Sequence, residues 1–165
     1  MLKPNGLVKI SGGGLNNDLV LEYLRGFTKE YSTVVITGGG SDINKAFREK
    51  GYEIKFCPLG RVMDTLEERQ LARNILEKNQ AKLQDLLDEK GIIARVGIPY
   101  SEIETVTCPE NGDLTVLRSY GGFDKIVIFT RKKMVKKKKA WVKKVAKAFS
   151  HIAKGELDKI EVRGF

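Results

Sequence analysis

The stretches Leu7-Val-Lys-Ile-Ser-Gly-Gly-Gly14 and Thr33-Val-Val-Ile-Thr-Gly-Gly-Gly-Ser41 each run from a short apolar strand into three glycines, and a helix-like segment follows each. Glycine tolerates positive φ and lets a ligand approach the backbone, so such turns present bare amide N–H groups at a helix N-terminus. The repeated pattern predicts two turns that contact an anion such as phosphate. Glycine-rich turns can also serve close packing alone, and neither triplet matches a P-loop or a GxGxxG motif.

Apolar periodicity divides the chain into alternating strands and helices. This alternation, with short connections, predicts an α/β fold: a three-layer αβα sandwich around a largely parallel sheet. Between two of the strands, Asn111-Gly112 predicts a hairpin turn. Helices are expected over 17–31, 42–50, from the capping box at Thr65 to Gly91, and over 132–153. Strands are expected over 7–11, 33–37, 52–57, 92–98, 103–107, 114–118, 124–130 and 159–165.

The size and composition of the chain are those of one ordinary globular domain, which we expect to span residues 1–165. No apolar run approaches the roughly 20 residues that a membrane helix needs, so no membrane contact is expected. The N-terminal residues lack the apolar core of a signal peptide. Cys57 and Cys108 lie far apart without a CxxC spacing, which favours neither a metal nor a disulfide framework. A cytoplasmic location is therefore expected.

The positive charge of the chain is concentrated in one segment. The formal net charge is +9, but residues 131–147 alone carry ten lysines and arginines and no acid, so the remainder is close to neutral. The segment also has an apolar stripe that includes Trp141 and Val145, which predicts a helix packed on the sheet with its lysines in water. Binding of nucleic acid or an acidic membrane is the alternative interpretation.

Two basic side chains are candidates for the site. Lys9 lies two residues before the first glycine triplet, where a fixed ammonium could stabilise the charge on a transferring phosphoryl group. Arg61 precedes a capped helix, and its planar fork suits bidentate binding of a carboxylate or phosphate. The alternatives are a strand lysine that faces solvent and an ordinary surface arginine. His151, the single histidine, has no partner visible in the sequence and is interpreted as structural.

These pieces, in this order, resemble the amino acid kinase superfamily, especially N-acetylglutamate kinase and its uridylate and isopentenyl phosphate kinase relatives. Val8-Lys-Ile-Ser-Gly-Gly-Gly14 is similar to the family's first strand, and the second triplet with Asn44 is similar to its second glycine loop. Gly60-Arg-Val-Met-Asp64 resembles the acetylglutamate kinase segment whose arginine grips the substrate carboxylate. The resemblance implies that Lys9 is catalytic. It also implies that phosphate and substrate are bound by Gly12, Gly13, Gly14, Gly38, Gly39, Gly40, Ser41 and Arg61.

The second half of the chain resembles the family less. Gly122-Phe-Asp-Lys-Ile-Val-Ile-Phe-Thr130 is similar to the strand that opens the nucleotide-binding half, which implies nucleotide contacts for Asp124 and Thr130. In the family an aspartate usually follows the threonine, whereas Arg131 follows it here, and family members are longer. The resemblance divides the chain into an acceptor-binding half, 1–100, and a reduced nucleotide-binding half, 101–165.

The resemblance implies an ATP-dependent kinase that transfers a phosphoryl group from Mg·ATP to a small acid or phosphate. ATP and Mg2+ are the implied cofactors, and a homodimer would be ordinary for the family. The rival interpretation is a non-catalytic member of the fold, which binds an anion, nucleic acid or a protein partner through the lysine-rich helix.

Overall fold

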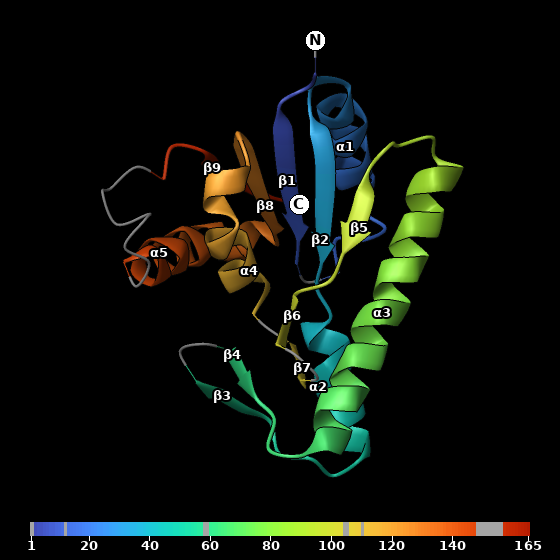
Figure 1. Ribbon diagram of the computed structural model, residues 1–165, viewed down its shortest axis with the longest axis vertical. Helices are drawn as coiled ribbons and strands as arrows, with labels where there is room; N and C mark the ends of the chain where they lie inside the picture. The colour runs from blue at the N-terminus through green and yellow to red at the C-terminus, as the bar shows by residue number, and fades with distance from the viewer. Residues whose placement is uncertain (1, 12, 58–59, 104–105, 110, 148–156) are drawn as a thin grey trace.

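A five-stranded sheet forms the centre of the molecule (Figure 1). The computed structural model describes the chain except residues 1, 12, 58–59, 104–105, 110 and 148–156. The strands follow the order β5-β2-β1-β8-β9, and all neighbouring pairs run parallel. They are β1 (Asn5–Ile10), β2 (Ser32–Thr37), β5 (Arg95–Gly97), β8 (Lys125–Thr130) and β9 (Ile160–Gly164).

Helices cover both faces of this sheet, which confirms the predicted three-layer α/β sandwich with its parallel sheet (Figure 1). Side chains that alternate along β1 explain the two layers: Leu7 packs with one apolar cluster, and Val8 packs with another on the opposite face. The first cluster includes α4 (Gly112–Arg118) and α5 (Val135–Ala146). The second includes α1 (Asp18–Glu30) and the C-terminal part of α3 (Leu66–Glu89).

The long helix α3 also builds a wall beyond the sheet. Its first turns pack Ala72 and Leu76 against Ile43 and Phe47 of α2 (Gly40–Glu49), in a third apolar cluster. Because α2 follows β2, this cluster lies beyond the carboxyl edge of the sheet (Figure 1). Two antiparallel hairpins also form: β3 (Lys55–Cys57) with β4 (Gly60–Val62), and β6 (Tyr100–Ile103) with β7 (Val106–Pro109).

Local signals at helix starts explain where α3 and α4 begin. Thr65 accepts a hydrogen bond from the Glu68 amide, and Glu68 accepts one from the Thr65 amide, which is the predicted capping box. The predicted hairpin turn at Asn111-Gly112 is wrong. The Asn111 side chain instead accepts a hydrogen bond from the amide of Asp113 and caps α4.

Other expected boundaries differ from the structure. The segment 114–118 lies in helix α4 rather than in a strand, because burial of its apolar residues against the sheet outweighs strand propensity. The expected strand 92–98 is reduced to β5, and part of 103–107 contributes to the β6–β7 hairpin. The lysine-rich helix begins with a 3-10 turn, Lys132–Met134, and continues as α5, whereas its expected end at 148–153 lies outside the described residues.

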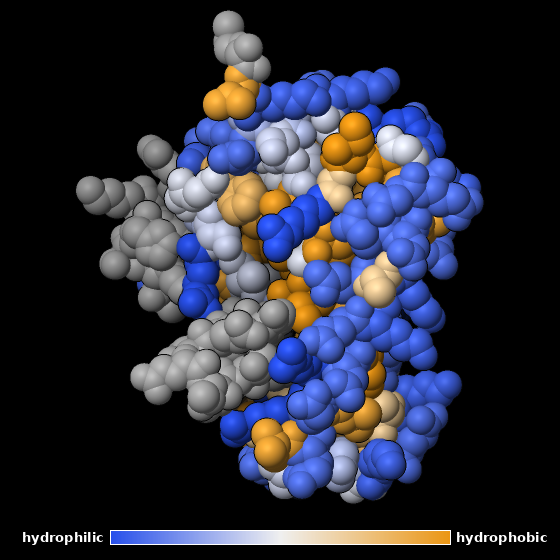
Figure 2. Space-filling view, turned by 45° about the vertical axis from the view of Figure 1, so that its right-hand side comes forward, coloured by the Kyte–Doolittle hydropathy of each residue, from blue (hydrophilic) through white to orange (hydrophobic). Residues whose placement is uncertain are grey.

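One face of the molecule is mainly hydrophilic, with separate apolar areas between the polar side chains (Figure 2). Among the described residues, the large apolar side chains that remain exposed are Leu2, Leu19, Phe56, Leu66 and Ile93. Within the same described part of the chain, no helix has both the length and the apolar character required to cross a bilayer.

Candidate functional site

A pocket of about 410 Å³ opens at the carboxyl ends of β1 and β2. Ligands of parallel α/β sheets bind outside this edge, because the strand-to-helix turns there present amides and variable side chains. The pocket joins predicted site residues from three segments: Lys9, the second glycine turn with Ser41, and Arg61. Arg131, which was not predicted as a site residue, also lines it.

Lys9 forms part of a buried ion cluster on the α4 side of the sheet. Its Nζ donates to Oδ1 of Asp113 at 2.8 Å, while Nζ of Lys138, from α5, donates to Oδ2 at 2.5 Å. Lys9 is only 5% exposed and Asp113 only 2%, so both charges are withdrawn from bulk water. One carboxylate therefore joins β1, α4 and α5 directly beside the pocket, and the alternative of a solvent-facing Lys9 is excluded.

The protonation states of this cluster depend on burial and on the neighbouring charges. Burial lowers the pKa of Lys9, and Lys138 lowers it further, although the carboxylate of Asp113 acts in the opposite direction. Burial alone would raise the pKa of Asp113, but the ammonium groups of Lys9 and Lys138 hold it below its ordinary value. Asp113 is therefore ionised at neutral pH and neutralises part of the positive charge at the pocket.

Gly112 is required for the path of the Lys9 side chain. A Cβ atom at this position would lie 2.7 Å from Cε of Lys9, so a methyl group there would force the buried, ion-paired Lys9 side chain to shift. Since Asn111 caps α4 immediately before it, the turn aligns both the Asp113 carboxylate and the space through which Lys9 reaches it. Asn111 and Gly112 were interpreted from sequence as a turn, and their role at this site was not predicted.

The second glycine turn forms one wall of the pocket. Gly39 occupies the N-cap of α2 and has no side chain to cover the first amides of the helix, which thus begins at the pocket. The turn is held from behind by Asn79 of α3, whose amide nitrogen donates to the carbonyl of Gly38 at 3.3 Å and to the Asp42 carboxylate at 2.9 Å. Asn79 was not among the predicted site residues.

The first glycine turn is placed differently. Gly13 has a φ of 81°, and Gly14 lies beneath the ring of Phe165, which a Cβ atom at Gly14 would approach to 2.7 Å. Neither residue lines the pocket, although the neighbouring Ser11 does. Gly12 lies outside the described residues. The structure therefore assigns Gly14 a packing role and does not bring Gly13 or Gly14 to the pocket wall.

Arg61 lies on β4 and reaches across the pocket towards α2. Its Nη2 donates to Oδ1 of Asn44 at 2.6 Å and to the carbonyl of Gly40 at 3.4 Å. The guanidinium lies 5.2 Å from the ring centre of Phe47 and 4.8 Å from that of Phe56, within the range of cation–π attraction. Burial lowers its pKa, but a guanidinium remains charged at neutral pH.

One guanidinium nitrogen of Arg61 has no hydrogen-bond partner among the described residues. This nitrogen, Nη1, is buried. A buried unpaired donor costs about 1–3 kcal/mol, and more when the group is charged. Arg61 also lines the pocket, and this unpaired nitrogen distinguishes it from an ordinary surface arginine.

The two residues predicted to contact a nucleotide lie at opposite ends of β8. Thr130 is buried at the carboxyl end but does not line the pocket. Asp124 precedes the strand, and its carboxylate accepts a hydrogen bond from the amide of Asn5 at 2.7 Å, at the amino edge of the sheet. The structure thus brings neither of them to the pocket, and it separates Asp124 from the other predicted residues by the length of the strand.

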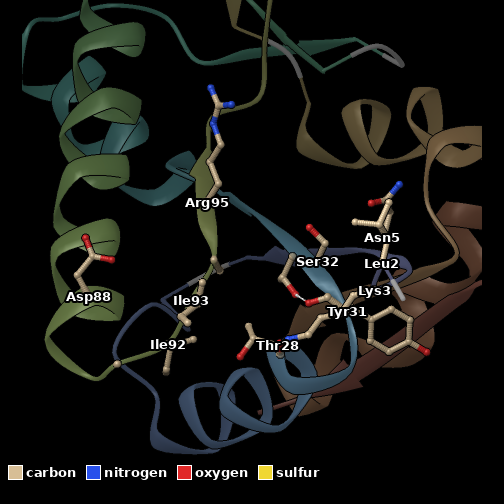
Figure 3. A pocket seen from close by; sticks show the side chains of 13 residues that line it. Leu2, Lys3, Asn5, Thr28, Tyr31, Ser32, Asp88, Ile92, Ile93 and Arg95 are labelled. Carbon is tan, nitrogen blue, oxygen red and sulfur yellow. Dashed lines mark hydrogen bonds between the residues drawn. The ribbon is translucent and has the colours of Figure 1, made fainter.

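A larger hollow of about 890 Å³ lies at that amino edge (Figure 3). It is wide open, its walls include the exposed Leu2 and Ile93, and the Lys3 ammonium beside it donates to the carbonyl of Thr28. None of the predicted site residues lines it. We therefore place the candidate site at the smaller pocket, where buried charges converge.

The fold and the pocket together define an α/β protein with a cationic, glycine-lined pocket at the carboxyl edge of a parallel sheet. Neither a family model nor a curated protein sequence matches the chain. Among solved structures, it is similar to N-acetylglutamate synthase from Neisseria gonorrhoeae complexed with coenzyme A and N-acetyl-glutamate, with a TM-score of 0.50 and 15% identity over 79% of this chain. N-acetylglutamate synthase from the same bacterium complexed with coenzyme A and L-arginine is similar with a TM-score of 0.54 and 11% identity over 98% of this chain.

The likeness is one of fold only, at these levels of identity. The chain spans 42% and 56% of the lengths of the two synthase chains, so it corresponds to about half of each.

These comparisons correct the predicted family and activity. The similar structures are N-acetylglutamate synthases complexed with coenzyme A, rather than amino acid kinases with ATP. The predictions of an amino acid kinase, of ATP-dependent phosphoryl transfer, and of ATP and Mg2+ as cofactors are therefore wrong. The physical reason is that a glycine-lined, cationic sheet edge indicates anion binding without specifying the reaction. The rival prediction of a non-catalytic binding protein receives no specific support from the comparisons.

Proposed function

We propose that the chain binds a small carboxylate metabolite, of the acylated amino acid class, in the pocket between Lys9 and Arg61. The observation that carries the proposal is the convergence on one pocket of Lys9, Arg61, Arg131 and the second glycine turn. Three cationic side chains thus come from β1, β4 and the end of β8, and the start of α2 adds the backbone amides of the glycine turn. A small anion is the ligand that such an arrangement favours.

The chemistry of Arg61 favours a carboxylate. Nη2 is already engaged by Asn44 and Gly40, while Nη1 has no partner. A carboxylate oxygen can accept a charge-assisted hydrogen bond from this fork, and the cation–π contacts with Phe47 and Phe56 help to hold the guanidinium in place. Lys9 would lie near a second anionic group of the ligand, with Asp113 controlling its charge.

The size of the pocket restricts the ligand. A volume of about 410 Å³ is near the lower end for small-molecule sites and suits a metabolite of about the size of an acylated amino acid. One similar solved structure contains N-acetyl-glutamate, which belongs to this chemical class. That ligand is a property of the synthase and supplies the first compound to test on this chain.

Isothermal titration calorimetry tests the proposal directly. The ligands are N-acetyl-glutamate, glutamate, L-arginine, coenzyme A, inorganic phosphate and Mg·ATP. We expect heat from N-acetyl-glutamate, and we expect Arg61→Gln to weaken its binding about 10- to 100-fold, because a charged hydrogen bond contributes about 1.5–3 kcal/mol. Arg48→Gln is the matched control: it removes the same charge from an exposed position of α2 and should leave affinity unchanged.

Two results would overturn the proposal. One is the absence of binding for every carboxylate at millimolar concentration. The other is equal weakening by Arg61→Gln and Arg48→Gln, which would indicate a general charge effect. The predicted homodimer and cytoplasmic location stay predictions.

A further inference from the structure

The outer side of α5 carries a row of positive charges that the pocket does not use. Lys132, Lys136, Lys139, Lys143 and Lys147 are all exposed. The spacing of three and four residues places Lys136, Lys139 and Lys143 in one row along α5, while Lys132 lies in the 3-10 turn before the helix and Lys147 directly after it. We call these five lysines the α5 basic face. A second exposed row, which includes Lys137 and Lys144, flanks it. The helix lies on the outside of the sandwich (Figure 1), and its buried apolar side chains pack towards the sheet, so the exposed Lys136, Lys139 and Lys143 lie on its solvent side.

These lysines are not balanced by nearby acids. Across the described residues, none of the five takes part in an ion pair, whereas Lys138 of the same helix is paired with Asp113. The segment 131–147 contains no acid, and the remainder of the chain is close to neutral. The positive field is therefore local, and like charges at this spacing repel one another unless an anion lies against them.

The surroundings of the row distinguish between polyanions. The apolar side chains of α5, including Trp141, Val142 and Val145, pack against the sheet and are not available to insert into a bilayer. The row itself has no aromatic side chain on which unpaired bases could stack, as single-strand binders require. What remains is regularly spaced positive charge along α5, whose 12 residues span about 18 Å at about 1.5 Å per residue. A duplex carries one charge per about 1.7 Å of axis, so it offers a denser row of phosphates than the row of lysines requires.

We propose that the α5 basic face docks on the phosphate backbone of double-stranded nucleic acid, without reading the bases. Contacts to phosphates position a protein on a duplex but carry no sequence information. Each neutralised phosphate releases counterions, so the logarithm of the affinity falls with the logarithm of salt concentration, with a slope of about −0.9 per contact. Five contacts predict a slope of about −4 to −5.

Fluorescence anisotropy with a labelled duplex of random sequence tests the proposal over a range of salt concentrations. The variant Lys136→Glu/Lys139→Glu/Lys143→Glu reverses the centre of the face. The control Lys29→Glu/Lys78→Glu/Lys82→Glu makes the same change in net charge at exposed positions of α1 and α3. We expect the first variant to lose at least about 30-fold in affinity and to have a slope shallower by about 3, while the control changes affinity less than about threefold.

Three outcomes would overturn the proposal. The first is equal loss of affinity in both triple variants, and the second is no binding of wild type to the duplex at low salt. The third is tighter binding to phosphatidylserine vesicles or to single-stranded oligonucleotides of the same length than to the duplex. Circular dichroism of each variant establishes that α5 is intact, so that a lost contact is not confused with a lost helix.

Discussion

Asp113 is the shared counterion of the two lysines beside the pocket. It accepts hydrogen bonds from Lys9 and Lys138, and both Lys9 and Asp113 are buried. A buried ion pair contributes little net stability relative to apolar residues, but removal of one partner leaves an uncompensated buried charge. The cluster therefore fixes the position of Lys9 at the pocket more than it strengthens the fold.

Replacement of this carboxylate should be costly at neutral pH. We expect Asp113→Asn to lower the free energy of unfolding by about 3–5 kcal/mol at pH 7, because Lys9 then has to be buried as an unpaired charge or to lose its proton on folding. Urea denaturation provides the measurement. Asp85→Asn is the control, since Asp85 is exposed on α3 and the same change there should cost less than about 0.5 kcal/mol. Equal costs for the two variants would disprove the role of the cluster.

The lowered pKa of Asp113 predicts that the stability of the fold depends on pH. The pKa of Asp113 in the folded state lies below its ordinary value of 3.8, since the ammonium groups of Lys9 and Lys138 outweigh the effect of burial. A depressed carboxyl pKa stabilises the fold above the unfolded-state value, and this stabilisation is lost as the pH falls through the folded-state value. We therefore expect the contribution of the Asp113 carboxylate to the free energy of unfolding of wild type to be complete above about pH 5 and to shrink below about pH 4. A contribution that grows in acid would show the opposite sign.

Gly112 gives a steric test of the Lys9 position. Gly112→Ala adds a methyl group where the structure leaves 2.7 Å to Cε of Lys9, so we expect weaker binding of N-acetyl-glutamate and a loss of about 1–3 kcal/mol in stability. By helix propensity alone, the same substitution would stabilise α4 by up to about 1 kcal/mol. Gly121→Ala is the control, because nothing lies within 4 Å of a Cβ atom there. Stabilisation by Gly112→Ala would mean that Lys9 does not take the path described.

At this scale the sequence could predict some site residues and not others. Of the predicted residues, Lys9 and Arg61 both line the candidate pocket: Lys9 near the end of a strand of the parallel sheet, and Arg61 on the β3–β4 hairpin that precedes α3. Asp113 was not predicted, since it lies 104 residues from Lys9 and follows an Asn-Gly pair that also suits a hairpin. The only indication of Asn79 in the sequence is that it is a polar residue within the apolar stripe of α3.

Helix α3 is the element that supports the pocket from outside the sheet. Its N-terminal half packs on α2, and Asn79 holds the second glycine turn, so the position at which α3 begins determines where this wall lies. The capping box predicted from Thr65 and Glu68 marks that position in the sequence and in the structure. Elements with such local signals are the most predictable.

The cap of α3 can be tested alone. Thr65→Ala removes the hydroxyl that accepts from the Glu68 amide, and we expect it to lower the free energy of unfolding by about 1 kcal/mol in thermal or urea denaturation. Thr65→Ser retains the acceptor and should remain within about 0.3 kcal/mol of wild type. If both substitutions cost the same, the hydrogen bond is not the source of the stability.

Helix α4 shows where local signals fail. Its apolar and β-branched residues favour a strand, but Leu114, Val116 and Leu117 are all buried against the sheet in helical conformation. The cap at Asn111 and the tertiary packing decide the outcome together, and neither is evident from a short stretch of sequence.

For the whole molecule, the architecture was more predictable than the chemistry. Alternating strands and helices with buried apolar strands predict a parallel sheet covered on both faces, and the order β5-β2-β1-β8-β9 with its two helical layers agrees. The reaction could not be derived in this way, because a cationic edge with glycine turns is compatible with many ligands. The predicted ATP-dependent kinase failed for this reason.

A crystal structure of the protein grown with N-acetyl-glutamate tests the carboxylate site most directly. We expect one carboxylate of the ligand within about 3 Å of a guanidinium nitrogen of Arg61, with the ligand between Lys9 and the second glycine turn. A ligand bound instead in the hollow at the amino edge of the sheet, or a pocket that stays empty at saturating ligand, would show that the charges converging on this edge serve another purpose.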